Sequence, residues 1–205
     1  MDGNKVLGNK LGLISSADLA REEERISKKK AVELFESGML DKLEAGNFSA
    51  LKAIHKYLFD KIYDFAGEIR KVNISKSNFR FAHLMYLEAT LENIDKMPQS
   101  TFDEIVEKYV EMNIAHPFRE GNGRVTRIWL DLILKTELHM VVDWSKVEKD
   151  DYLLAIERSP VRDIEIKHIL KAALTDDINS REVYMRGIDQ SYYYEGYTTF
   201  KTEEL

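Results

Sequence analysis

The stretch that decides how this chain folds reads HPFREGNGRVTR and occupies residues 116–127. From Gly123 onward, apolar residues recur at i, i+3, i+4, i+7 and i+8, and these residues are Val125, Ile128, Trp129, Leu132 and Ile133. That spacing places them on one face of a buried helix. The unpaired N–H groups and the positive dipole end at the start of such a helix attract anions. The loop before Gly123 is therefore predicted to bind an anion.

Residue types in the second half of this stretch suit a polyphosphate. Gly121 and Gly123 carry no side chain that would keep a phosphate from the backbone, and they allow the positive φ of a curled loop. Asn122 adds a neutral hydrogen-bond donor. Arg124 and Arg127 share a helix face, where two guanidinium groups can bind successive phosphates. We expect a nucleoside di- or triphosphate as the ligand.

The first half of the stretch supplies groups for chemistry. Glu120 is a carboxylate beside the predicted phosphate site, a usual position for Mg²⁺, which keeps most of its other ligands as water and substrate oxygens. His116 precedes it, and an imidazole with an ordinary pKa of about 6.5 is suited to take a proton from a hydroxyl at neutral pH. Phe118 is predicted to point into the core. His116 is thus the candidate general base and Glu120 the candidate metal ligand.

Each of these residues also has a common structural explanation. An Asn-Gly pair often marks a turn, a single histidine is usually structural, and two arginines on one helix face often form a salt bridge. The combination is much rarer, since this spacing would arise by chance on the order of 10⁻⁹ times per position at about 5% usage for each residue type. The combination therefore indicates a functional site.

Helical patterns flank this stretch on both sides. Capping residues predict where the helices start. The expected starts are Ser15 with Asp18, for a helix over about 17–37, then Ser49, Ser100 with Asp103, Ser145 with Glu148, and Ser159 before Pro160. One or two shorter helices are expected over about 177–196. Within residues 67–81, Val72 and Ile74 alternate with polar residues and predict a short hairpin that turns at residues 76–78. The predicted fold class is mainly α with one β-hairpin.

Composition places the chain among single-domain proteins. Its 205 residues, 44% of them hydrophobic, suffice for one core, so residues 1–205 are predicted to form one domain. A net charge of −6 and a pI near 5.5 give no basic surface for nucleic acid. The absence of cysteine fits a reducing compartment, and no apolar run reaches the roughly 20 residues that span a membrane. We expect a cytoplasmic protein that binds neither nucleic acid nor membrane.

The stretch at residues 116–127 resembles the signature of the Fic family, H-x-F-x-[DE]-G-N-G-R-x-x-R, at every specified position. The sequence YDFAGEIR at residues 63–70 is similar to the segment that precedes the flap of Fic proteins. The resemblance covers about residues 50–200 and implies a helical Fic domain. It also implies an adenylyltransferase that transfers AMP from ATP to a Ser, Thr or Tyr hydroxyl of a target protein, with Mg²⁺ as the cofactor.

The same resemblance assigns roles within the active-site loop, residues 116–124, and in the flap. It implies that His116 deprotonates the target hydroxyl and that Glu120 binds Mg²⁺. The residues that hold the ATP phosphates are then Gly121, Asn122, Gly123, Arg124 and Arg127. The flap, about residues 69–81, pairs with the target as an added strand. Its docking residues are Val72, Asn73, Ile74 and Ser75. Strand pairing tolerates many sequences, so the target cannot be identified from the sequence. A second copy of this chain is one possible target.

Some Fic proteins carry an inhibitory helix with the pattern [ST]-x-x-x-E-[GN], and SYYYEG, from Ser191 to Gly196, matches it. The resemblance implies an inhibitory helix over about residues 187–196. If this helix folds over the loop, the Glu195 carboxylate is expected to pair with Arg127 in place of a phosphate. Some relatives with such a glutamate also remove AMP, so Glu195 is a candidate for positioning water in that reverse reaction.

Several alternatives remain open at this point. A kinase-like relative would transfer the γ-phosphate, but such relatives replace the glycines that are present here as Gly121 and Gly123. A phosphocholine transferase would share the whole motif. The chain could instead be a catalytically silent binding module closed by its C-terminal helix, against which the intact His116 and Glu120 argue. A homo-oligomer is compatible with the sequence, which does not decide the oligomeric state.

Overall fold

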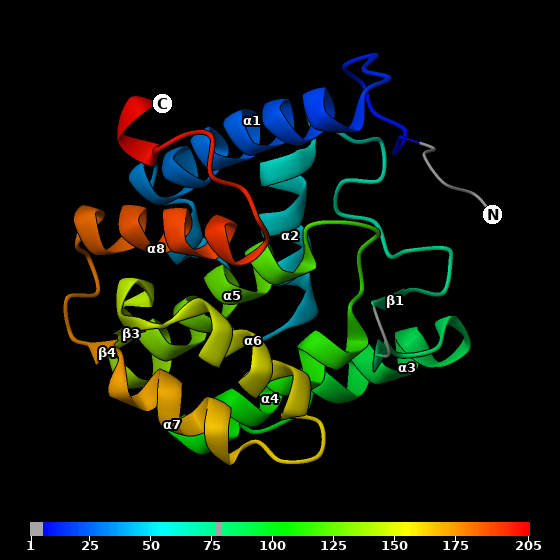
Figure 1. Cartoon of the computed structure of the whole chain (residues 1–205). Helices are drawn as coiled ribbons and strands as arrows, with labels where there is room; N and C mark the ends of the chain where they lie inside the picture. Colours follow the sequence, from blue (N-terminus) through cyan, green and yellow to red (C-terminus); the bar gives the residue numbers. More distant parts are fainter. Residues whose placement is uncertain (1–5, 77–78) are drawn as a thin grey trace.

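The computed structural model describes residues 6–76 and 79–205, and the chain is mainly helical there (Figure 1). In this described part the α-helices are α1 Ser16–Glu36, α2 Phe48–Phe59, α3 Leu84–Asp95, α4 Phe102–Ala115, α5 Asn122–Leu138, α6 Lys149–Arg158, α7 Ile164–Ala172 and α8 Arg181–Tyr194. The described part also contains two antiparallel strand pairs, β1 Ser75–Lys76 with β2 Phe79–Arg80 and β3 Val141–Val142 with β4 Leu174–Thr175. The predicted fold class is confirmed. No helix among the described residues is long and apolar enough to cross a bilayer.

Helix α5 lies in the middle of the domain, as the sequence predicts. Helices α2, α4 and α8 all pack against it (Figure 1). Val125, Trp129 and Ile133 on its inner face are fully buried, and Trp129 Nε1 donates to the Asn47 carbonyl at 3.0 Å. Because this face is buried along its length, the start of α5 is held firmly, and the loop before it is presented at a fixed place.

The hairpin is shorter than the sequence predicts. Strands β1 and β2 have two residues each, with Ser75 opposite Arg80, and the predicted turn at residues 76–78 falls partly outside the described residues. Val72 and Ile74, whose alternation suggested a strand, lie before β1 in an irregular segment. The second pair, β3 with β4, and helix α3 are not predicted at all. Two-residue strands leave no alternating pattern to detect.

The first two helices show how local capping signals can compete. Ser15 caps α1 as predicted, and its hydroxyl accepts a hydrogen bond from Asp18 N. Helix α2 is capped by Asn47, whose Oδ1 accepts from Ala50 N at 3.0 Å, so the predicted cap Ser49 lies inside the helix. Both Asn and Ser are good caps, and the sequence pattern alone does not choose between neighbours.

Helix α4 starts one residue later than predicted. Thr101 Oγ1 accepts from Glu104 N at 3.3 Å, and Glu104 Oε2 accepts from Thr101 N at 3.0 Å, which makes a reciprocal capping box. The predicted pair was Ser100 with Asp103, which has the same spacing. The predicted start is wrong by one residue because Thr101 and Glu104 form a second pair with the same spacing.

Helices α6 and α7 also start elsewhere than predicted. Ser145 lies inside the 3₁₀ turn Trp144–Lys146, and α6 begins after Glu148. Ser159 ends α6, where a new helix was expected to begin, and α7 begins only at Ile164. Ser159 Oγ donates back to a carbonyl of α6 rather than accepting from a following N–H. The Ser159 hydroxyl therefore hydrogen-bonds to the end of α6 and does not cap the start of α7.

The C-terminal region forms the single helix α8, after which the chain turns back over α1 (Figure 1). Glu24 on α1 accepts hydrogen bonds from the backbone N–H groups of Thr199 at 3.1 Å and Phe200 at 3.0 Å. Lys28 donates to the Phe200 carbonyl at 2.6 Å. The tail is thus fixed to α1, and it holds the end of α8 close to the start of α5.

Candidate active site

The loop between α4 and α5, residues 116–121, is closed by one side chain. Asn122 donates from Nδ2 to the Phe118 carbonyl and accepts at Oδ1 from the Phe118 N–H, both at 2.8 Å. Phe118 is fully buried, as predicted, and stacks on His55 with ring centroids 3.9 Å apart. The side chain of Asn122 therefore shapes the loop, and only its backbone N–H, in the first turn of α5, is left to face a ligand.

His55 of α2, which the sequence analysis does not single out, fixes the other side of the loop. Its Nδ1 accepts from the Gly67 N–H at 2.8 Å, so Nε2 carries the proton and donates to the Glu120 carbonyl at 2.9 Å. Burial lowers the pKa of His55 to about 4. The ring is thus neutral at pH 7 and ties the loop to the segment that leads into the flap.

Two glycines shape the start of α5. Gly121 has a φ of +78°, and a Cβ there would lie 2.6 Å from ring carbons of Phe59, so a larger residue is disfavoured at this position. A Cβ on Gly123 would lie 2.3 Å from Glu195 Oε1 and 3.1 Å from Arg127 Nη1, so Gly123 lets these two side chains approach the backbone. The space above Gly123 is filled by the Glu195 carboxylate.

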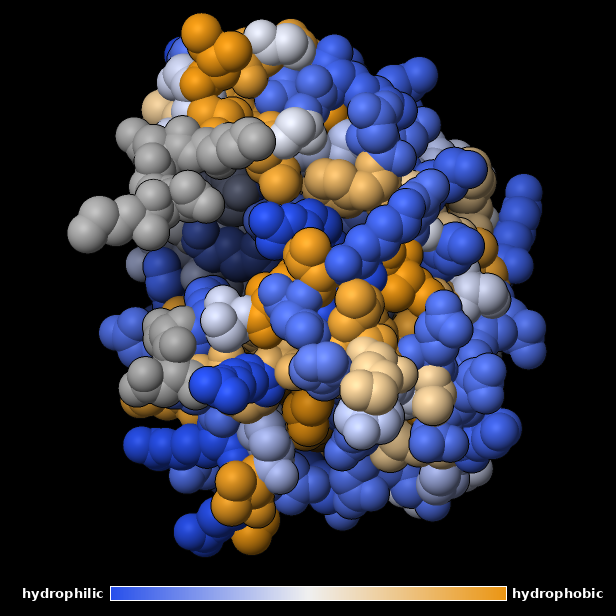
Figure 2. Space-filling view, turned by 90° about the vertical axis from the view of Figure 1, so that its right-hand side faces the viewer, coloured by the Kyte–Doolittle hydropathy of each residue, from blue (hydrophilic) through white to orange (hydrophobic). Residues whose placement is uncertain are grey.

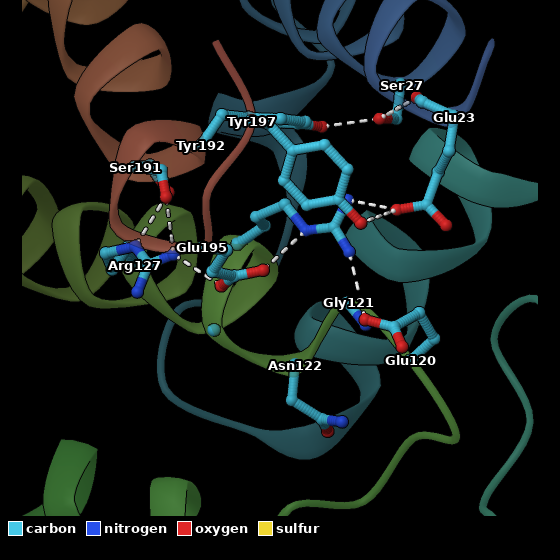
Figure 3. Close-up of polar contacts among 12 residues, drawn as sticks. Glu23, Ser27, Glu120, Gly121, Asn122, Arg127, Ser191, Tyr192, Glu195 and Tyr197 are labelled. Atoms are coloured by element: carbon cyan, nitrogen blue, oxygen red, sulfur yellow. Dashed lines mark hydrogen bonds and ion pairs between the residues drawn. The ribbon is translucent and has the colours of Figure 1, made fainter. Parts of the chain in front are cut away.

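Glu195 projects from the end of α8 toward α5 (Figure 3). Its Oε1 accepts a hydrogen bond from Arg127 Nη2 at 2.7 Å, and its Oε2 lies 2.9 Å from Arg124 Nε. Burial acts to raise the pKa of Glu195, but the two guanidinium groups hold that pKa below its usual value. Glu195 is therefore ionised where an anion would bind. The expected contact with Arg127 is present, and the contact with Arg124 is additional.

Arg127 is held by α8 at several points. Its Nε donates to Ser191 Oγ at 2.7 Å, and its Nη2 donates to the Ser191 carbonyl at 2.9 Å. Its Nη1 donates to Tyr152 OH of α6 at 3.3 Å. Ser191 and Glu195, both in the inhibitory pattern, thus contact the same arginine. Gly196, the third pattern residue, has a φ of +89° and lets the chain leave the helix.

Arg124 is fully buried under the loop. Glu23 of α1 pairs with its Nη1, and Glu120 Oε1 lies 3.1 Å from its Nη2. Aromatic rings surround the guanidinium, with centroids at 5.1 Å for Phe59, 5.2 Å for Tyr192 and 4.7 Å for Tyr197. Its Nε, beside Glu195, forms no hydrogen bond with the described residues. Sequence reasoning misses Glu23 because no local pattern links α1 to a residue 101 positions away.

His116 faces the same cavity from the end of α4. Its φ is +48°, which is uncommon for a residue with a side chain, and its ring stacks on Phe81 with centroids 3.7 Å apart. Burial lowers the pKa of His116 to about 4, although the charge of Glu195 opposes the shift. The imidazole is therefore neutral at pH 7 and can accept a proton.

Glu120 is suited to share a divalent cation with a bound phosphate. Its Oε1 accepts from Gly121 N at 2.9 Å and from Arg124 Nη2 at 3.1 Å, and its Oε2 takes no hydrogen bond from the described residues. Across residues 6–76 and 79–205, no cluster of three or more His, Cys, Asp or Glu could hold a metal by itself. A Mg²⁺ ion at Glu120 would take its other ligands from substrate phosphates and water, as this ion usually does.

One cavity of about 620 Å³, which is large enough for a nucleotide, is lined by His116, Glu120, Gly123, Arg127 and Glu195. The flap, the loop, α6 and the end of α8 supply its walls. Leu153, Ile156 and Pro160 provide apolar surface on one side, and Ile74 and Phe79 provide it on the flap. On the face of the molecule that carries the flap, polar and apolar side chains are interspersed (Figure 2).

The predicted docking residues of the flap differ in what they offer to a partner. Ile74 lines the cavity, and Ser75 lies in the exposed strand β1. Val72 is 46% exposed. The side chain of Asn73 is engaged within the chain, since its Oδ1 accepts from Leu84 N at 2.8 Å at the start of α3. Ile74 and Ser75 therefore line the cavity and Val72 is exposed, whereas the side chain of Asn73 is bound within the chain.

Comparison with known proteins identifies this arrangement. Residues 46–134, from the cap of α2 to the middle of α5, match the Fic/DOC family. The chain contains a Fic domain. It is 30% identical over 200 residues to the protein adenylyltransferase VbhT of Bartonella schoenbuchensis, which takes in 90% of this chain but only 41% of that protein. It is 26% identical over 186 residues to the probable protein adenylyltransferase Fic of Salmonella typhimurium, covering 85% of this chain and 90% of that protein.

Solved Fic domains share the fold. The N-terminal Fic domain of an effector protein from Bartonella sp. AR 15-3 gives a TM-score of 0.71 at 21% identity, covering 85% of this chain and 90% of that chain. BepC of Bartonella tribocorum, solved with bound AMPPNP, gives 0.67 at 19% identity and covers 85% of this chain and 95% of that chain. The Fic architecture is thus retained at low sequence identity.

Replacing Glu195 by glycine is predicted to turn the closed site into a free anion site. The melting temperature should fall, because two buried arginines lose a counter-charge. Inorganic pyrophosphate should then stabilise the variant more than the parent. At 100 times its Kd for the variant, pyrophosphate should raise the variant's free energy of unfolding by about 2.7 kcal/mol. Differential scanning fluorimetry measures both effects, with the exposed Glu203→Gly as the matched control. An equal response of parent and Glu195→Gly to pyrophosphate would contradict an anion site under Glu195.

Proposed function

We propose that this Fic domain is a protein adenylyltransferase that moves AMP from ATP to a side-chain hydroxyl of a target protein. The observation that carries the proposal is that the neutral imidazole of His116, the first turn of α5 at Gly123 and Arg127 line one cavity, in which the Glu195 carboxylate pairs with Arg127 and with the buried Arg124. Such a site has a base for the hydroxyl and positive charge for the phosphates. The relatives named as protein adenylyltransferases support the same activity.

In the proposed reaction, the target hydroxyl oxygen attacks the α-phosphorus of ATP. A new P–O bond forms, the bond to the bridging oxygen of the β-phosphate breaks, and pyrophosphate leaves. His116 takes the hydroxyl proton, while the first-turn N–H groups of α5, Arg124 and Arg127 hold the phosphates in line. A Mg²⁺ ion at Glu120 would neutralise phosphate charge. The remaining contribution of the chain is orientation of the two reactants.

We also propose that the end of α8, residues 187–196, inhibits this reaction. Glu195 is hydrogen-bonded to Arg127 and fills the space above Gly123. The γ-phosphate needs the same guanidinium, so ATP would bind with its phosphates shifted. A displacement of about 1 Å from in-line geometry can cost on the order of 10²-fold in rate. Inhibition would therefore act mainly on the rate of transfer and less on ATP affinity.

The Glu195→Gly variant is predicted to transfer AMP faster than the parent, by on the order of 10²-fold, because Arg127 is freed for the phosphate. The gain should be lost in the double variant Glu195→Gly/Arg127→Ala. Initial rates of labelled AMP incorporation into protein test both statements, with Glu203→Gly as the control. A well-folded Glu195→Gly protein that is no faster than the parent would defeat autoinhibition and leave the Fic domain assignment standing.

The pH dependence of the same reaction tests the base. In the Glu195→Gly background, transfer is predicted to stay constant from about pH 8 to about pH 5.5, since burial holds the pKa of His116 near 4 and loss of the Glu195 charge lowers it further. His116→Ala should abolish transfer but keep the rise in melting temperature that ATP causes. A rate that falls with a midpoint near the ordinary pKa, about 6.5, would contradict a buried neutral base.

The Glu195 carboxylate also supports a proposal of AMP removal. It lies against the phosphate site, where it could accept a proton from a water that attacks the phosphorus of a modified side chain. The bond from that phosphorus to the side-chain oxygen then breaks, the oxygen takes a proton from solvent, and AMP and the free hydroxyl are released. AMP release from the modified protein should therefore be slower for Glu195→Gly than for the parent, and equal rates would rule the proposal out.

Intact-protein mass spectrometry of the modified target separates AMP from phosphocholine or phosphate transfer. An unmodified target would favour a silent binding module.

A further inference from the structure

The guanidinium of Arg70 lies buried under the base of the flap and donates only to backbone carbonyls of the described residues. The residue is 3% exposed. Its Nε donates to the His116 carbonyl at 2.8 Å and its Nη1 to the Val72 carbonyl at 2.7 Å. Its Nη2 donates to the carbonyls of Ala82 and, at 3.3 Å, Ala115. One side chain thus joins both ends of the flap to the end of α4.

Backbone hydrogen bonds reinforce this junction. Arg70 N donates to the Pro117 carbonyl at 2.8 Å where the chain enters the flap, and Ala82 N donates to the Ile114 carbonyl at 2.9 Å where the chain returns. The flap is therefore fastened on both sides to the segment that carries the base. Its two-residue strands could not by themselves hold it in place.

An arginine suits this position for geometric reasons. Its N–H groups point outward from a rigid planar fork, so one side chain can bridge acceptors on different segments, whereas a lysine presents its donors at a single point. No ion pair among the described residues involves Arg70, and carbonyl dipoles compensate its charge. Burial lowers the pKa of Arg70, but a guanidinium keeps its proton.

The same contacts control the geometry of the base. A left-handed backbone is strained at a residue with a side chain, and it persists where the surroundings hold it. At His116 the carbonyl is held by Arg70, and the ring stacks on Phe81. Phe81 immediately precedes Ala82, which Arg70 also holds. A displaced guanidinium would therefore shift the flap and the imidazole relative to each other.

We propose that Arg70 is a positioning residue that sets the distance between a target strand on the flap and the base His116. The proposal rests on the adenylyltransferase function proposed above. Arg70 is not among the residues that line the cavity, so it acts through the backbone that it holds. Its loss should impair use of the protein acceptor without impairing ATP binding.

The test compares Arg70→Lys and Arg70→Gln with the same substitutions at Arg181, which is exposed on α8, all in the Glu195→Gly background. The acceptor is a His116→Ala copy of this chain. The Arg70 variants should lose on the order of 10- to 10²-fold in kcat/KM for the acceptor and keep the rise in melting temperature with ATP. Amide hydrogen exchange over residues 72–82 should become faster, and the Arg181 variants should match their background.

Unchanged exchange over residues 72–82 with unchanged transfer would overturn the proposal. A parallel loss of ATP stabilisation would also overturn it, because that result indicates a general structural role. If the Glu195→Gly protein does not modify this acceptor, self-modification fails separately, and the exchange rates still decide whether Arg70 holds the flap. Arg70→Lys keeps the charge and serves as the test if Arg70→Gln does not fold.

Discussion

Two buried arginines near the start of α5 are the constraint on which this site depends. Removing a guanidinium from water costs several kcal/mol unless carboxylates and hydrogen bonds compensate it. Three carboxylates pair with Arg124 or Arg127, from Glu23 on α1, Glu120 in the loop and Glu195 at the end of α8. Glu23 is 2% exposed and lies on the far side of Arg124 from the cavity, whereas Glu195 borders the cavity. Glu23 is therefore the fixed counter-charge, whereas Glu195 occupies the position that an anionic ligand would take under the proposed function.

The fixed counter-charge also anchors the segment that carries Glu195. Glu23 accepts hydrogen bonds from Tyr197 OH at 2.9 Å and from Tyr63 OH. One turn of α1 further on, Ser27 accepts from Tyr192 OH at 2.6 Å (Figure 3). Tyr192 and Tyr197 flank Glu195 in the sequence, so α1 holds the chain on both sides of the Glu195 carboxylate. The hydrogen bonds that dock α1 and the ion pairs of the site therefore belong to one network, which is connected through Glu23.

The sequence predicts best what a contiguous pattern carries. The loop at residues 116–124 and helix α5 follow from local spacing, and the contact between Glu195 and Arg127 follows from two short motifs that lie 68 positions apart. Glu23 and His55 do not follow, because a carboxylate on a charged helix and a lone histidine have no spacing partner that marks them as buried. Helix starts shift by one or two residues in α2 and α4 because adjacent residues are all competent caps.

Glu195 is the C-cap residue of α8, and Tyr192 and Tyr197 on either side of it are hydrogen-bonded to α1. A rotation of the Glu195 side chain alone would leave both of these hydrogen bonds in place. Undocking the helix would instead expose buried side chains, at about 1.5–3 kcal/mol each. A ligand shifts an equilibrium only by its differential affinity for the two states, so a nucleotide more easily drives the smaller change. After that rotation, Ser191 still holds Arg127 through Nε and Nη2. Under the proposed function, the end of α8 would thus block the phosphate position with Glu195 and orient Arg127 with Ser191. Loss of the whole helix is therefore not equivalent to loss of the Glu195 carboxylate.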